Sequence, residues 1–73
     1  MTELAVRNDI RQWRLAHAEM TQAELARLCG VTRQTIIALE AEKYSPSLEL
    51  AFKLARALGR RLDEVFRYEE EEK

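Results

Sequence analysis

Residues that break or lock a chain are scarce in this sequence of 73 residues, which contains two glycines, one proline and one cysteine. Because Cys29 has no second cysteine to pair with, no disulfide within the chain can hold the fold. No stretch approaches the roughly 18 apolar residues of a membrane-spanning helix, and no secretory signal precedes the first charges. These absences argue against a disulfide-rich secreted scaffold and a membrane protein, and they favour one soluble, cytoplasmic domain.

The net charge of −1 hides an uneven distribution of charge along the chain. Four of the thirteen acidic residues occupy positions 69–72, next to Lys73, and residues 1–68 carry a net charge of +2. A run of like charges at a chain end repels itself and is usually disordered. We therefore expect a domain over residues 1–68 and a disordered acidic tail over residues 69–73. Mimicry of DNA or docking of a basic partner by this tail is the alternative.

Helix-forming residues dominate the composition, and caps and apolar spacing divide the chain into five expected helices. The first begins near Arg7, and its buried stripe at helical spacing consists of Val6, Ile10, Trp13 and His17. The next three begin at the polar N-caps Thr21, Thr32 and Ser47, and the glycine C-caps Gly30 and Gly59 end the second and the fourth helix. A short fifth helix covers residues 62–66, so the expected fold class is all-α.

The segment from Gln22 to Glu40 meets the steric demands of two helices joined by a tight turn. The apolar residues where the two helices meet are Leu25, Cys29, Val31, Ile36 and Leu39. The small Ala26 stands where the helices cross, and Gly30 lies in the turn. The turn needs a positive φ, which glycine adopts at little cost. A random pair of amphipathic helices rarely meets all these demands in one short window, so the pattern predicts a helix-turn-helix.

These residues, together with the segments IRQWR, MTQAELARLCGVTRQTI, YSPSLELAFKLARAL and LDEVF, resemble the Cro/phage-repressor-type family of helix-turn-helix regulators, also called xenobiotic-response-element-like. The resemblance runs from about Arg7 to Tyr68 and is closest to compact, single-domain members. It implies a five-helix, lambda-repressor-like domain that binds double-stranded operator DNA as a homodimer. We interpret the protein as a transcriptional regulator, a repressor reading a palindromic operator, with no cofactor and no small-molecule ligand.

In such domains the second motif helix lies in the major groove, with its N-terminal residues at the base edges. The resemblance and this docking geometry assign base reading to Thr32, Arg33, Gln34 and Ala38. The fork of an arginine suits guanine, the amide of a glutamine suits adenine, and an alanine methyl can touch that of thymine. Phosphate contacts are expected from Gln22, Thr35, Lys43 and Tyr44.

Arg14 and Glu40 can be interpreted as DNA contacts or as an internal pair, and the resemblance favours a structural ion pair. The sequence departs from the family pattern in three places. The link between Arg14 and Gln22 is one residue longer, which predicts an extended or bulged end to the first helix. Ile37 stands where many members carry asparagine, and Arg61 stands where a serine often caps the last helix.

Large apolar side chains near the C-terminus suggest a patch that needs a partner, because a chain this short has a thin core. We expect the dimer contact to consist of Leu62, Val65, Phe66 and Tyr68. A second possibility, suggested by close relatives of the compact type, is that residues 66–68 pair as a short strand with residues 4–6.

Three further residues have a functional and a structural interpretation, and we favour the structural one each time. Cys29 is expected in the core rather than as a redox switch, and Trp13 in the core rather than stacked on a base. His17 lacks the additional ligands that a metal site needs. No nucleophile–base pair, metal set or phosphate-binding glycine loop points to an enzyme. The remaining alternative function is a protein-interaction module on the same fold, such as an antitoxin.

Overall fold

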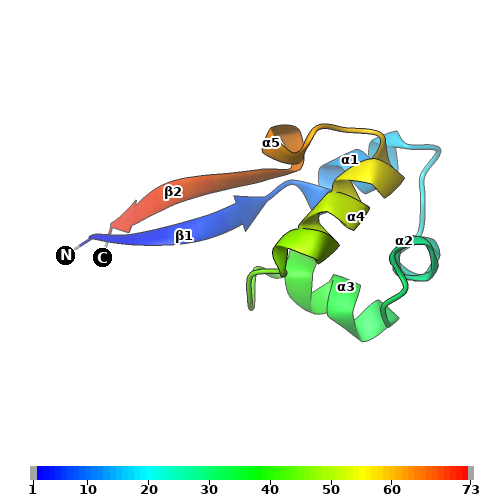
Figure 1. Ribbon diagram of the computed structural model, residues 1–73, viewed down its shortest axis with the longest axis horizontal. Helices are drawn as coiled ribbons and strands as arrows, with labels where there is room; N and C mark the ends of the chain where they lie inside the picture. The colour runs from blue at the N-terminus through cyan, green and yellow to red at the C-terminus, as the bar shows by residue number, and fades with distance from the viewer. Residues whose placement is uncertain (1, 73) are drawn as a thin grey trace.

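Five helices form the body of the domain, and a two-stranded antiparallel ribbon extends from it (Figure 1). The computed structural model describes residues 2–72, with side chains for residues 5–70. Within this part of the chain the elements follow in the order β1 (Thr2–Asn8), α1 (Ile10–Ala16), α2 (Gln22–Cys29), α3 (Arg33–Glu40), α4 (Leu48–Leu58), α5 (Leu62–Val65) and β2 (Phe66–Glu72). Figure 1 shows the ribbon projecting to one side of the helices, so the domain has one elongated arm.

Polar N-caps and left-handed glycines set the ends of the middle helices, as the sequence predicts. The hydroxyl oxygens of Thr21, Thr32 and Ser47 each accept a hydrogen bond from the backbone N–H three residues later, at 3.0, 3.2 and 3.1 Å. Gly30 and Gly59 end α2 and α4 with φ of +71° and +68°. Each cap satisfies backbone groups that have no partner within the helix itself, which fixes where the helix begins or ends.

The two strands correct two expectations from the sequence. Arg7, expected at the start of the first helix, lies in β1, and α1 begins at Ile10 instead. Residues 69–72, expected in a disordered tail, are the last four residues of β2, while Lys73 lies outside the described residues. Successive strand residues point to opposite faces, which separates Glu69 from Glu70, and the ladder supplies partners for the backbone. The domain is therefore mostly helical with a small sheet, rather than all-α.

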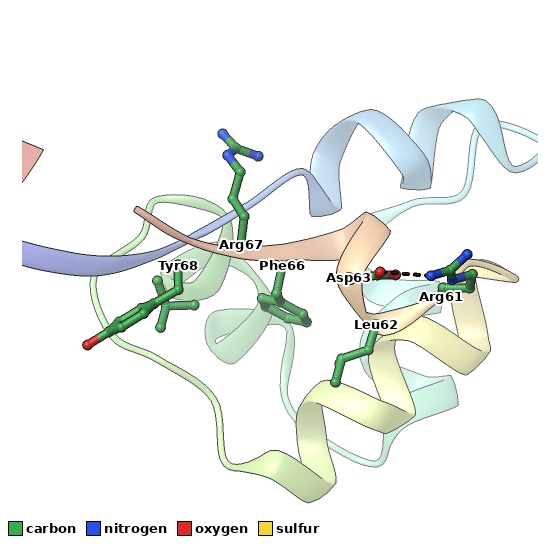
Figure 2. Close-up of a pocket in the computed structure, with 7 residues that line it drawn as sticks. Arg61, Leu62, Asp63, Phe66, Arg67 and Tyr68 are labelled. Atoms are coloured by element: carbon green, nitrogen blue, oxygen red, sulfur yellow. Dashed lines mark hydrogen bonds and ion pairs between the residues drawn. The ribbon is translucent and has the colours of Figure 1, made fainter. Parts of the chain in front are cut away.

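The two segments expected to pair do so, but in a register shifted by two residues: residues 66–68 lie opposite residues 6–8, and residues 4–6 lie opposite residues 68–70. Val6 lies opposite Tyr68, and Asn8 lies opposite Phe66. Successive side chains along a strand point to opposite faces of the sheet. Phe66 and Tyr68 therefore lie on one face and Arg67 on the other, as Figure 2 shows.

One core gathers side chains from all five helices. Its buried members are Ile10, Leu25, Ala26, Cys29, Ile36, Leu39, Leu54, Ala55, Leu58 and Val65. Trp13 packs against this cluster, donates its indole N–H to the carbonyl of Glu64 at 2.8 Å and lies 4.0 Å beneath the Arg60 guanidinium. Burial raises the pKa of the Cys29 thiol, which fits its expected place in the core.

No helix within residues 2–72 is long and apolar enough to span a lipid bilayer.

The connection from α1 to α2 is bulged. Ala18 and Glu19 both have positive φ, +56° and +53°, which non-glycine residues rarely adopt. The chain returns at Met20, whose backbone N–H donates to the carbonyl of Arg14 at 3.0 Å. The bulge absorbs the extra residue between the two helices, one of the two outcomes that the longer link predicts.

Asn8, the last residue of β1, fastens the ribbon to two helices. Its Oδ1 accepts a hydrogen bond from the backbone N–H of Ile10 at 3.1 Å, and its Nδ2 donates to the carbonyl of Leu39 at 2.8 Å. The Asp9 side chain at the N-cap position of α1 makes no capping bond to the described chain. Asn8 therefore supplies a partner to the start of α1 and to the end of α3 together.

Replacing Asn8 with alanine should lower the free energy of unfolding by about 1–3 kcal/mol, because a part-buried carbonyl and a helix-start N–H both lose their partner. Urea denaturation followed by far-UV circular dichroism measures the loss. Gln12→Ala, on the exposed face of α1, is the matched control and should change stability by less than about 0.5 kcal/mol. Equal stabilities of the two variants would contradict the linking role of Asn8.

Candidate nucleic-acid interface

Helices α2 and α3 pack against each other as the two helices of a helix-turn-helix. The apolar residues expected at their interface are at most 4% exposed, and they are Leu25, Ala26, Cys29, Ile36 and Leu39. Val31 packs against them from the turn. A Cβ on Gly30 would meet no atom within 4 Å, so the positive φ, not lack of space, requires the glycine. This packing orients α3 and leaves its first turn at the surface.

The first turn of α3 presents two polar side chains that are available to a ligand. Arg33 and Gln34 are exposed, and neither forms a hydrogen bond or ion pair with any residue that the structure describes. Thr32 and Thr35 are engaged in the cap, since the Thr32 hydroxyl accepts the Thr35 N–H and lies 3.1 Å from the Thr35 hydroxyl. Ala38, one turn beyond Gln34, is partly exposed. The helix start is thus held by the threonines and displays a guanidinium and an amide.

A buried ion pair links α1 to the C-terminal end of α3. Nε and Nη2 of Arg14 donate to the two carboxylate oxygens of Glu40 at 2.7 and 3.2 Å, and the side chains are only 9% and 8% exposed. The remaining nitrogen, Nη1, donates to the carbonyl of Met20 at 2.8 Å. Arg14 and Glu40 therefore face each other inside the domain and form a structural ion pair rather than two DNA contacts.

Gln22, the first residue of α2, joins the same network. Its Nε2 donates to Oε1 of Glu40 at 3.0 Å, so one carboxylate accepts hydrogen bonds from α1 and from α2. An amide nitrogen carries two protons, so one proton remains for a phosphate near the start of α2. Backbone N–H groups at a helix start also favour anions. The phosphate contact expected of Gln22 stays a prediction, now with a defined geometry behind it.

Lys43 and Tyr44 lie in an exposed loop after α3. Tyr44 is 47% exposed, and neither side chain has a polar partner among the described residues. The preceding Glu42 is fixed instead: the backbone N–H of Asn8 and the guanidinium of Arg7 hold the pKa of the Glu42 carboxyl below its usual value. The loop therefore starts from a fixed point and exposes one ammonium group and one phenol.

An apolar groove runs along the ribbon and α5 (Figure 2), lined by Val6, Leu62, Phe66 and Tyr68 with Arg61, Asp63 and Arg67. A second groove shares three of these residues and adds Ser45, Pro46, Leu48 and Ala51. Leu48 and Tyr68 are each 67% exposed, a high value for such large apolar side chains. We call the combined surface the apolar face and define it by Val6, Pro46, Leu48, Leu62, Phe66 and Tyr68.

The expectation that Val65 forms part of a dimer contact is wrong. Its side chain is 1% exposed and packs in the core, because the single turn of α5 directs it toward the helices. The sequence interpretation also missed Val6, Pro46 and Leu48 on the apolar face. Val6 fits both the helical stripe and the possible strand over residues 4–6, so its sequence position does not decide between the two. Leu48 carried a usable signal, since an apolar residue directly after the Ser47 cap begins a helix whose own buried stripe starts later.

The folded unit with an exposed third helix places the protein in the class of helix-turn-helix domains. The sequence model of the helix-turn-helix family matches residues 10–65. A Methanocaldococcus jannaschii protein named as an HTH-type transcriptional regulator is 46% identical over 67 residues, which cover 92% of this chain and 100% of that protein. A protein of the same description from Methanothermobacter thermautotrophicus is 58% identical over 53 residues, covering 71% of this chain and 77% of its own length. A Bacillus subtilis relative is 39% identical over 66 residues, covering 90% and 98%.

The chain belongs to the Cro/phage-repressor-type helix-turn-helix family, a family of DNA-binding transcriptional regulators. The resemblance seen in the sequence motifs is thereby confirmed. The family model matches the helical body, from the first residue of α1 to the last residue of α5, and does not extend to the ribbon.

Breaking the buried ion pair should cost far more than breaking an exposed one. Arg14→Met leaves the Glu40 carboxylate buried without its charged partner and should lower the free energy of unfolding by about 3–5 kcal/mol. The double variant Arg14→Met, Glu40→Leu removes both charges and should lose less than the single variant. Urea denaturation of the three proteins checks this order. A loss below about 1 kcal/mol for Arg14→Met, the range of surface pairs, would contradict it.

Proposed function

We propose that the protein is a homodimeric, sequence-specific DNA-binding repressor that acts in the cytoplasm and reads a palindromic operator through the major groove. The observation that carries the proposal is the first turn of α3, where Arg33 and Gln34 are exposed and have no polar partner in the described chain, on a helix fixed by buried packing. A dimer seated on promoter DNA blocks other proteins from that duplex. The protein acts by occupancy and not as an enzyme.

The side chains at the start of α3 match the chemistry of base edges. The Arg33 guanidinium can donate two parallel hydrogen bonds to O6 and N7 of guanine, and the Gln34 amide can pair with N6 and N7 of adenine. Thr32 and Ala38 border these two and complete the surface that faces the bases. Recognition helices contact bases with their N-terminal residues, which fits this placement.

Phosphate contacts come from groups that flank α3 on both sides. Gln22 offers its second amide proton beside the start of α2, and Thr35 adds a hydroxyl at the start of α3. Lys43 and Tyr44 extend from the loop that follows. Such contacts fix the register on the duplex and supply the salt-dependent part of the affinity.

The apolar face supports pairing of two subunits. Its exposed Leu48 and Tyr68 and its half-buried side chains line two adjoining grooves that share Leu62 and Phe66, which a thin core leaves uncovered. A two-fold axis would bring the same surface of each subunit together, with the ion pair between Arg61 and Asp63 of each subunit, 2.8 Å long, at its edge. The two α3 helices would then reach successive major grooves about 34 Å apart, which makes the operator a palindrome.

Replacing Arg33 with alanine should weaken binding to the operator by about 1–3 kcal/mol and relax preference at one base pair of each half-site. Fluorescence anisotropy on duplexes from the region upstream of its own gene measures both effects. Arg56→Ala is the matched control, because Arg56 is an exposed arginine on α4 and loses the same charge. Its base preference should match that of the parent protein.

If Arg33→Ala and Arg56→Ala weaken binding equally and without sequence preference, α3 does not read bases. If no duplex binds at any salt concentration, the proposal fails, and an antitoxin-like interaction module on the same fold takes its place.

Replacing Tyr68 with aspartate should convert the dimer into a folded monomer, because a charge then lies in the centre of an apolar contact. Sedimentation velocity measures the mass, and far-UV circular dichroism verifies the fold. Leu15→Asp, at an exposed leucine on α1 outside the apolar face, should remain dimeric. A parent protein that sediments as a monomer at micromolar concentration would contradict pairing through this face.

A further inference from the structure

Helix α3 ends in a Schellman motif with a glutamate in the position that normally favours glycine. The backbone N–H of Lys43 donates to the carbonyl of Ala38 at 3.0 Å, and that of Glu42 donates to the carbonyl of Leu39 at 3.0 Å. Glu42 has a φ of +58°, in the left-handed region. Glycine is common at this position because it lacks the Cβ that makes such a conformation costly. A strained residue of this kind persists only where its surroundings stabilise it.

The contacts that stabilise Glu42 come from β1. Its Oε2 accepts the backbone N–H of Asn8 at 3.0 Å, and its Oε1 accepts Nη1 of Arg7 at 2.8 Å. Asn8 also donates its side-chain amide to the carbonyl of Leu39 at 2.8 Å. Two successive residues of the strand thus grip the end of α3, through one carboxylate and one backbone carbonyl.

The segment that follows Glu42 touches both surfaces of the proposed function. Lys43 and Tyr44 are exposed and extend without polar partners in the described chain, as phosphate contacts would. Ser45 and Pro46 then line the groove that also contains Val6 of β1, within the apolar face. Glu42 is therefore a fixed residue directly before the proposed phosphate contacts, Lys43 and Tyr44, and three residues later the chain reaches the proposed dimer surface.

We propose that Glu42 is a positioning residue that couples the apolar face to the DNA-facing loop. Its carboxylate fixes Lys43 and Tyr44 relative to β1, so the strand that helps form the dimer surface also sets where the phosphate contacts lie. A simple helix end would be served better by glycine, which needs no stabilising contact. The glutamate adds a link to the strand that glycine cannot provide. This inference rests on the proposed function of operator binding by a dimer.

Two substitutions separate positioning from capping, measured by operator affinity at several salt concentrations. Glu42→Gln removes the charge that Arg7 contacts, and Glu42→Gly removes every side-chain contact while relieving the positive φ. Glu49→Gln is the matched control, because Glu49 is exposed on α4 and its substitution changes the net charge equally. Loss of a negative charge alone should leave affinity for DNA unchanged or raise it.

We expect both Glu42 variants to bind the operator about fivefold to tenfold more weakly, because the loop must now be ordered on binding in each subunit. The slope of log affinity against log salt should fall by about 2 per dimer, one phosphate contact per subunit. Glu49→Gln should keep the parent affinity or exceed it. Glu42→Gly should keep the unfolding midpoint near that of the parent protein, and sedimentation should show unchanged dimerisation.

Parent-like affinity and salt slope in both Glu42 variants would overturn the coupling and leave Glu42 as a helix end only. A loss of affinity explained entirely by weaker dimerisation would overturn it as well. If the parent protein binds no duplex, the proposed function and this inference fall together. If the parent protein binds the operator and both Glu42 variants bind it with the same affinity, only this inference fails and the proposed function stands.

Discussion

The buried ion pair between Arg14 and Glu40 is the constraint on which the placement of α3 depends. A carboxylate that is 8% exposed is stable only with partners, and Glu40 obtains them from α1 and from Gln22 at the start of α2. The opposite end of α3 is fixed by the Thr32 cap and by packing against α2. With both ends held, the placement of α3, and with it the backbone position of Arg33, follows from the interior of the domain and exists before any ligand binds. Preorganisation of this kind lowers the entropy lost on binding.

A second polar junction, at Asn8 and Glu42, extends this constraint to the ribbon. Small domains bury little surface, so their polar contacts have a large share in fixing how elements meet. Here the hydrogen bonds of Asn8 join β1, α1 and α3 at one point, and the carboxylate of Glu42 joins the loop to the same strand. The ribbon, which carries part of the apolar face, and the C-terminal end of α3 are thus parts of one connected framework.

Much of the helical body could be predicted because its signals are local. The Thr21, Thr32 and Ser47 caps and the two left-handed glycines act within a few residues of themselves, and the steric pattern of the helix-turn-helix lies in one short window. The ribbon could not be predicted with the same precision, because Val6 and Tyr68 are far apart in sequence and Val6 also fits a helical stripe. The strand at residues 69–72 could not be predicted from their charge, because it depends on the backbone pairing that β1 supplies. Val65 and Glu42 depend on tertiary contacts that no local pattern shows.

Selection from a library of random duplexes tests whether two copies of a rigidly placed α3 read DNA. The purified protein is incubated with the library at moderate salt, and the bound duplexes are sequenced over several rounds. We expect enrichment of one palindrome, whose half-sites are centred about 10 base pairs apart with a guanine and an adenine adjacent in each. Enrichment of no sequence, or of a single half-site without a symmetric partner, would contradict it.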